Sequence, residues 1–200
     1  MRATSIVCSL ALNIVLICAA LGQSSFSLRN YDPPYVNAPV FDSQGVALEG
    51  LNYMAELWGS ATPDSLTPVL TFASRQRVFV PFDSGGGAGY FSDPEGRSFG
   101  DQLTVLGVPP YTGLAWLEVR AWDSRLGATY EEVAARSQGG FGESPLFSAH
   151  GSYPLALLGI PAPLDGLQSF NLRPEVPEPS AVWLLLLGLP LLLWRKCFPS

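Results

Sequence analysis

Proline and glycine recur so often along this chain that long helices have little room to form. There are 18 Pro and 20 Gly among the 200 residues. Pro interrupts a helix because it lacks a backbone donor, and Gly does so because it is conformationally free. Hydrophobic residues still make up 48% of the chain and charged residues only 14%, so it has the material for a buried core. These counts favour a loop-rich, strand-based domain over a helical bundle.

The amino end has the pattern of a secretory signal peptide. Arg2 precedes an apolar run over residues 6–21. Small residues at Ala20 and Gly22 then have the spacing that signal peptidase requires, and a polar stretch follows. We therefore expect cleavage after Gly22, so that residues 1–22 are removed during export. An uncleaved amino-terminal anchor is the alternative.

The cysteine positions and the charge balance both distinguish residues 23–176 from the two ends of the chain. Cys8 and Cys18 lie in the amino-terminal segment and Cys197 lies near the other end, so residues 23–176 contain none. The exported part is therefore expected to have no disulfide, cysteine nucleophile or thiolate metal site. It has 8 Arg against 16 Asp and Glu, a net charge of −8. That charge repels phosphate backbones, so nucleic-acid binding is not expected.

The carboxyl end combines a proline-rich approach, a short apolar run and a basic pair. The run covers residues 181–194, and Arg195 and Lys196 follow it. Fourteen residues of helix would span about 21 Å, less than the ~30 Å hydrocarbon core of a bilayer. The two cations would stop transfer and stay on the cytoplasmic side. We expect a single short transmembrane helix within a sorting segment, residues 174–200. A buried carboxyl-terminal helix fits Pro190 poorly.

This end resembles the PEP-CTERM sorting domain of exported bacterial surface and exopolysaccharide-associated proteins. The resemblance rests on the leucine-rich span, on the basic pair, and on Val176, Pro177, Glu178, Pro179 and Ser180. It implies recognition by an exosortase and cleavage near Pro-Glu-Pro. It also implies a transient inner-membrane anchor, then release to the cell surface or extracellular matrix of a Gram-negative-type bacterium. The single Arg-Lys pair is shorter than the basic run of many members.

Residues 23–173 show short β-rich runs separated by turn residues. The clearest is 114–122, in which Ala115, Leu117, Val119 and Ala121 alternate with larger and polar residues. The first set is expected to face a core and the second to be partly wet. In residues 46–58 the face of Leu51, Tyr53, Ala55 and Leu57 has the same period. Further runs are residues 69–72, 78–82, 103–108, 146–149 and 167–172.

One helix and one flexible loop interrupt these strands. Thr129 and Glu132 have capping-box spacing, which predicts a helix over residues 130–136, and Gly139 offers a left-handed stop. Residues 83–89 are glycine-rich and predict a loop. The chain is thus expected to fold as an antiparallel β-sandwich-like single domain with one short helix. The middle also resembles a larger group of exported PEP-CTERM proteins, through residues 45–57, 119–123, 130–131, 139–142 and 169–172. That resemblance implies a shared scaffold without a known activity.

Candidate catalytic chemistry is sparse. His150 is the only histidine and no nucleophile-elbow motif accompanies it, so we assign no catalytic residue. Carboxylates for a secreted hydrolase could come from Glu118, Asp123, Glu131 and Glu132. An ion pair of Glu118 with Arg120 and a capping role for Glu132 explain two of them more simply.

Two binding sites can be considered. Asp83, Asp93 and Glu95 flank the glycine-rich loop, and such oxygen ligands suit Ca²⁺ outside the cell, although their spacing matches no calcium motif. A solvated acidic loop is the simpler interpretation, and no other cofactor is expected. Trp116 and Trp122 share the non-core face of one strand and could stack on sugar rings, unless another element covers them. The sequence therefore favours a non-enzymatic exported surface protein, with a carbohydrate-binding module for exopolysaccharide as the alternative.

Overall fold

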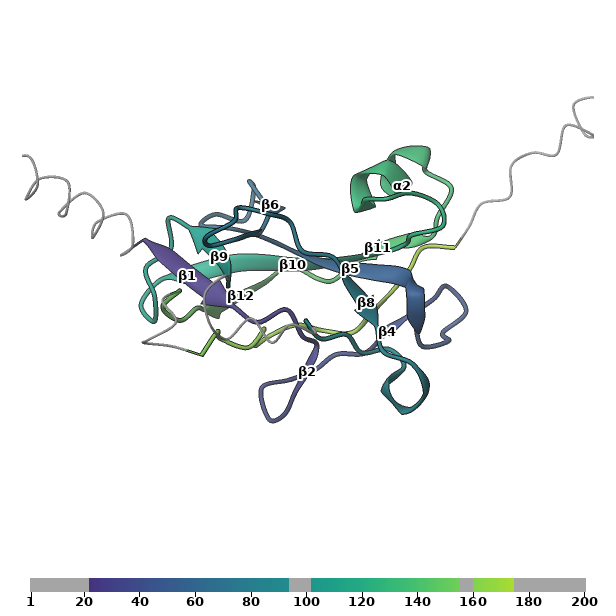
Figure 1. Cartoon of the computed structure of the whole chain (residues 1–200), viewed down its shortest axis with the longest axis horizontal. Coiled ribbons are helices and arrows are strands. Elements are labelled where there is room, and N and C mark those ends of the chain that lie inside the picture. The colour runs from purple at the N-terminus through teal and green to yellow at the C-terminus, as the bar shows by residue number, and fades with distance from the viewer. Residues whose placement is uncertain (1–21, 94–101, 155–159, 175–200) are drawn as a thin grey trace, which may run out of the picture.

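The computed structural model describes residues 22–93, 102–154 and 160–174 (Figure 1). Several predicted features lie outside these residues: Ala20 of the cleavage site, Glu95, the sorting residues Val176 to Ser180, the apolar run 181–194, and Arg195 with Lys196. Within the described residues, no helix has both the length and the apolar character needed to cross a membrane.

The protein is mainly β, with antiparallel sheets and one α-helix in its described part. The strands are β1 (Gln23–Phe26), β2 (Tyr31–Asp32), β3 (Val36–Asn37), β4 (Val40–Phe41), β5 (Gly50–Ser60), β6 (Thr67–Pro68), β7 (Leu70–Thr71), β8 (Val80–Phe82), β9 (Leu103–Leu106), β10 (Leu114–Asp123), β11 (Phe141–Glu143), β12 (Phe147–His150) and β13 (Phe170–Asn171). The helices are the 3-10 turn η1 (Gly85–Gly87) and α2 (Tyr130–Arg136).

The long antiparallel pair of β5 and β10 runs along the molecule (Figure 1). β11 and β12 pair with the other edge of β10, while β6 and β8 pair with β5. A second sheet has the order β1-β9-β7, β2 and β3 form a hairpin, and β4 pairs with β13 in parallel. In Figure 1, α2 lies above the long pair and the β2–β3 hairpin lies below it.

The predicted core face of β10 is confirmed. Ala115, Leu117, Val119 and Ala121 are all fully buried, as the period-two alternation requires of a strand with one face against a core. The main core continues through apolar residues of β1, β4, β8 and β9. Gly59 of β5 lies where the two larger sheets come together, because a Cβ there would be 2.8 Å from Leu117 and 3.0 Å from Val105. A glycine is therefore needed at this contact.

The opposite face of β10 was expected to be partly wet, and this is wrong at Trp122. That side chain is fully buried in a second cluster with Tyr130, Val133 and Phe141. Its indole Nε1 donates a hydrogen bond to the Gly127 carbonyl over 3.2 Å. Helix α2 and β11 cover this end of the sheet and exclude water from it.

Helix α2 has the predicted bounds, with a different stop. The Thr129 hydroxyl accepts from the backbone N–H of Glu132 over 3.3 Å, as in a capping box. The Glu132 carboxylate accepts from the N–H of Ala128, one residue before the cap. The helix ends at Ser137, which takes the left-handed conformation (φ 55) and donates its N–H to Ala134. Gly139 also has positive φ, but it lies beyond the end of the helix.

The strand predicted for residues 46–58 begins later, at Gly50. Residues before it form a turn in which the N–H of Asp42 donates to the Val46 carbonyl over 2.7 Å. Leu51 is therefore 75% exposed, whereas Ala55 and Leu57 are buried as predicted. The register of β5 against β8 also shifts between Gly50 and Met54, which separates Leu51 from the face that packs on the core.

Candidate functional site

The two tryptophans considered for sugar stacking do not form a shared surface. Trp122 is buried under α2 and meets Phe79 edge-on, with ring centroids 5.3 Å apart. Trp116 is half-buried, at the other end of β10, between Ser60 and Ser148. The aromatic platform considered for this strand therefore does not form, because α2 covers one of its two rings, as the simpler interpretation held.

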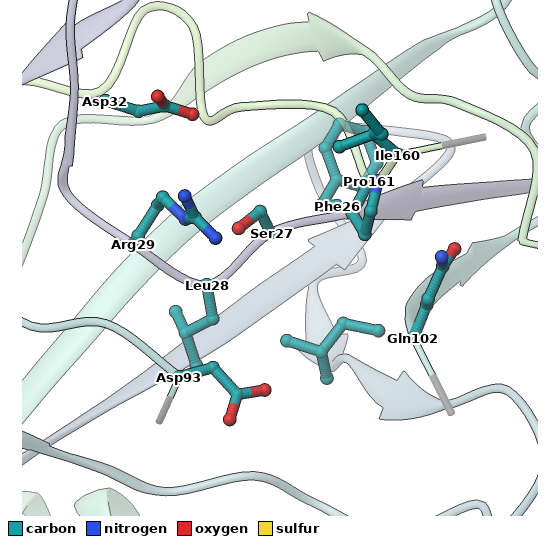
Figure 2. Close-up of a pocket in the computed structure, with 10 residues that line it drawn as sticks. Phe26, Ser27, Leu28, Arg29, Asp32, Asp93, Gln102, Ile160 and Pro161 are labelled. Carbon is teal, nitrogen blue, oxygen red and sulfur yellow. The ribbon is translucent and has the colours of Figure 1, made fainter. Parts of the chain in front are cut away.

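The acidic residues considered for Ca²⁺ are also separated. Asp83 is exposed at the end of β8. Asp93 instead lines a cavity of about 110 Å³, together with Arg29 and Gln102 (Figure 2). The described residues contain no group of three or more His, Cys, Asp or Glu side chains placed to hold a metal ion.

The carboxylates considered for hydrolysis all have other partners. Glu118 pairs with Arg120 over 2.5 Å, as the sequence predicts, and Glu132 caps α2. Asp123 pairs with Arg125. Glu131 pairs with Arg77 over 2.9 Å. His150 is exposed, and its Nδ1 lies 2.9 Å from the Gly113 carbonyl oxygen.

A charged network joins α2 to the sheet. Glu56 of β5 is only 1% exposed, and both its carboxylate oxygens accept from Arg77 over 2.5 Å. Arg77 also reaches Glu131 on α2. Its hydrogen bond with Glu56 raises the pKa of Arg77 against the effect of burial. Burial is the largest single effect on the pKa of Glu131 and acts to raise it, but the hydrogen bonds from Arg77, the backbone and Thr129, together with the charge of Arg77, outweigh burial and lower the pKa.

Aromatic rings enclose this network. The Arg120 guanidinium lies 3.6 Å from the centre of the Trp58 ring and 4.9 Å from that of Tyr130. The Trp58 indole donates to Glu56 over 3.0 Å, and the Tyr130 hydroxyl donates to Glu143. These groups are hydrogen-bonded or ion-paired with one another, so the network attaches α2 to the sheet and its charged groups are already paired within it.

An open pocket lies on the other side of the molecule, between the β2–β3 hairpin and the glycine-rich loop. We call it the tyrosine pocket. It has a volume of about 400 Å³ and is lined by Tyr31, Asp83, Gly86, Gly87, Tyr90, Phe91 and Ser92. The rings of Tyr31 and Tyr90 meet at 61°, with centroids 5.0 Å apart. Tyr31 is 54% exposed, so an aromatic surface faces solvent here.

A buried asparagine holds the two tyrosines together. Asn30 donates its side-chain N–H groups to the carbonyls of Ala38 over 2.7 Å and Gly89 over 2.9 Å, and its Oδ1 accepts from the N–H of Phe91 over 2.7 Å. It therefore bridges the segment that carries Tyr31 and the segment that carries Tyr90. These bonds satisfy the amide in a site without water contact, which fixes the relative position of the two rings.

The glycine-rich loop completes the pocket wall. The N–H of Asp83 donates to the Tyr90 carbonyl over 2.8 Å, which closes residues 83–90 into a compact loop around η1. Gly89 has φ +86, and a Cβ there would be 3.1 Å from Pro39, so the backbone conformation and the close approach both favour glycine. The Tyr90 hydroxyl donates to Asn37 Oδ1 over 2.8 Å, which ties the loop to the β2–β3 hairpin.

Tyr31 and Tyr90 were not identified from the sequence. Tyr90 directly follows the glycine-rich stretch that was singled out, so its position was a usable signal. Tyr31 lies 59 positions away along the chain, and only the fold brings it to the same pocket. Of the residues predicted for binding sites, Asp83 alone lies here.

Comparisons of the chain with protein-family models, with curated proteins and with solved structures found no match.

Proposed function

We propose that this chain is an exported surface or matrix protein whose β-rich domain binds a saccharide in the tyrosine pocket. The observation that carries the binding role is the Tyr31–Tyr90 pair beside the Asp83 carboxylate. A sugar ring presents C–H groups on its face and hydroxyls on its edge. An aromatic ring suits the first and a carboxylate the second. The volume of the pocket falls within the usual range for small-ligand sites.

Export and sorting are proposed on the sequence of the two ends. The apolar run before Gln23 supports signal-peptide cleavage after Gly22. The Pro177-Glu178-Pro179 motif, the apolar run and the basic pair support exosortase processing from a transient membrane anchor. We propose a non-enzymatic role, since the carboxylates considered for hydrolysis are held in ion pairs or in the helix cap.

The architecture proposed to carry this pocket is sandwich-like. The β1-β9-β7 sheet supplies Phe26, Leu103 and Val105 to the same core that β5 and β10 supply from the larger sheet. Two antiparallel sheets that share one core are the basis of a β-sandwich. In this arrangement the tyrosine pocket is formed by connections at the periphery, where binding residues commonly lie.

A glycan-array screen of the full-length chain tests the binding role. We expect wild type to bind at least one oligosaccharide class, and Tyr31→Ala to lose most of that signal because it removes the exposed ring. Tyr111→Ala is the matched control, since Tyr111 is equally exposed and pairs with Tyr153 elsewhere on the surface. Absence of binding to any glycan, or equal loss in both variants, would contradict the proposed site.

Mass spectrometry of the protein from its native host tests the sorting role. We expect Gln23 as the amino terminus and no peptide from residues 181–200. In a host that lacks the sorting enzyme, the tail should persist and keep the protein in the membrane fraction. Mature protein that retains Arg195 and Lys196 in the native host would contradict exosortase processing.

A further inference from the structure

We propose that the tyrosine pocket selects saccharides that carry a free primary amine over the same saccharides in N-acetylated form. This inference rests on the proposed saccharide-binding function and goes beyond it by naming the chemical class of ligand. The evidence is the charge of the pocket, the free carboxylate at its rim and the aromatic surface beside that carboxylate.

The pocket has an acidic and uncompensated lining. Asp83 is its only carboxylate, and no Arg, Lys or His lines it among the described residues. Glu49 is close by, since its Oε2 accepts from the N–H of Gly85 over 3.4 Å. An anionic sugar such as a uronic acid would therefore be repelled, and a cationic one attracted.

Arg29 lies close to the pocket through its backbone but does not line it. The backbone of Arg29 forms a β-bridge with Ser92, which lines the pocket. The side chain of Arg29, however, lines the separate cavity that also contains Asp32 and Asp93 (Figure 2). Among the described residues, Asp83 therefore forms no ion pair.

Asp83 is also held in place. Its N–H donates a hydrogen bond to the Tyr90 carbonyl. Its Cβ lies so close to Gly87 that a Cβ added to that glycine would be only 2.8 Å from it. The side chain is packed against a glycine at its base while the residue is exposed. A carboxylate on this anchored backbone, in the same pocket as Tyr31 and Tyr90, offers an ammonium group both a charge-assisted hydrogen bond and an aromatic face. Acetylation of the amine removes the charge and with it both interactions.

Isothermal titration of the full-length chain with two matched oligosaccharides tests the inference. The probes are a glucosamine oligomer and the N-acetylglucosamine oligomer of the same length, at about pH 6, where the amines are charged. We expect the amine form to bind on the order of tenfold more tightly, equivalent to about 1.4 kcal/mol. The preference should shrink in about 1 M salt, where the Debye length is ~3 Å.

Variants separate the amine preference from saccharide binding as such. Asp83→Asn should remove the preference while N-acetylated oligomer still binds, and Tyr31→Ala should weaken both probes. Asp64→Asn, at an exposed carboxylate outside the pocket, should bind as wild type does. Thermal melting of each variant shows whether it is folded; because Tyr31 is exposed, its replacement is expected to leave the fold intact.

The outcomes are distinct. Equal binding of the two probes by wild type, with Tyr31→Ala weakening both, overturns the amine preference and leaves the proposed function standing. A preference that survives Asp83→Asn overturns the role of this carboxylate. No binding of either probe, together with a blank glycan array, overturns the proposed function and the inference with it.

Discussion

Gly89 shows how much one residue can decide in this protein. It combines a positive φ with a tight approach to Pro39, and its carbonyl accepts from the Asn30 side chain. We expect Gly89→Ala to destabilise the fold by about 2 kcal/mol, because an L residue is strained in the left-handed region. Urea unfolding measures this change. Gly86→Ala is the control, since no atom lies within 4 Å of a Cβ there. Equal costs at the two positions would contradict the argument.

Glu56 is the second residue on which stability should depend. Its carboxylate is buried and bound by Arg77 and Trp58. We expect Glu56→Ala to cost about 3 kcal/mol, the lower end for a broken buried pair, since Arg77 keeps Glu131 as a partner. Chemical denaturation should show Glu49→Ala, at an exposed position, within about 0.5 kcal/mol of wild type. A similar, small loss in both variants would mean that Glu56 is not energetically coupled to Arg77.

Single residues were predictable where their role is local. The alternation in β10 identified Ala115, Leu117, Val119 and Ala121 as core, because the period of a strand places them on one face and their apolar side chains mark that face as buried. Burial of Glu56 could not be predicted, because Arg77, 21 positions away, makes it tolerable. Tyr31 and Tyr90 were missed for the same reason, since the pocket depends on a tertiary bridge through Asn30.

At the scale of elements, α2 was the most predictable piece. Its cap depends on residues three apart in the sequence, so Thr129 and Glu132 were sufficient to locate it. The residue that ends the helix was not predicted, because Ser137 adopts a left-handed conformation that is more typical of glycine. The start of β5 was missed because the turn after Asp42 uses residues that also fit a strand pattern.

The attachment of α2 to the sheet should depend on alkaline pH through Tyr130. Burial, and then the hydrogen bond to Glu143, raise the pKa of Tyr130 above its ordinary value of 10.0. A raised folded-state pKa contributes stability that is complete below the unfolded value and is lost as pH rises above it. We expect the melting temperature of wild type to fall as the pH rises above about pH 10.

Replacement of the hydroxyl isolates this contribution. Tyr130→Phe should be less stable than wild type near neutral pH, and should lose less stability over the same alkaline range. Tyr35→Phe, at an exposed tyrosine of the β2–β3 hairpin connection, should keep the pH profile of wild type. Parallel profiles for wild type and Tyr130→Phe would show that Tyr130 does not govern the alkaline loss.

At the scale of the whole molecule, the mainly β class followed from the Pro and Gly content and the strand patterns. The pairing of β4 with β13 did not, because these two-residue strands lie far apart in the chain and pair in parallel. Short strands carry too few residues to show a period. Their pairing depends on the core that both help to cover.

The fold should be indifferent to reductant. Residues 23–176 contain no cysteine, so packing, hydrogen bonds and ion pairs hold the domain together without a disulfide. We expect the melting temperature of the processed protein to be the same with and without dithiothreitol, as measured by circular dichroism. A clear drop on reduction would show that a cysteine outside this span contributes to stability.

The two ends of the described chain leave the domain at opposite ends of β10. Gln23 pairs with Leu106 near the start of β10, while the N–H of Arg173 donates to Phe141 of β11, which pairs with the end of β10 (Figure 1). Ten residues of strand extend roughly 33 Å. A protein tethered through its carboxyl end would therefore stand away from the tether by about that length, with Gln23 at the far tip. A reporter fused at Gln23 would be displayed outward, whereas one inserted after Arg173 would be confined near the attachment point.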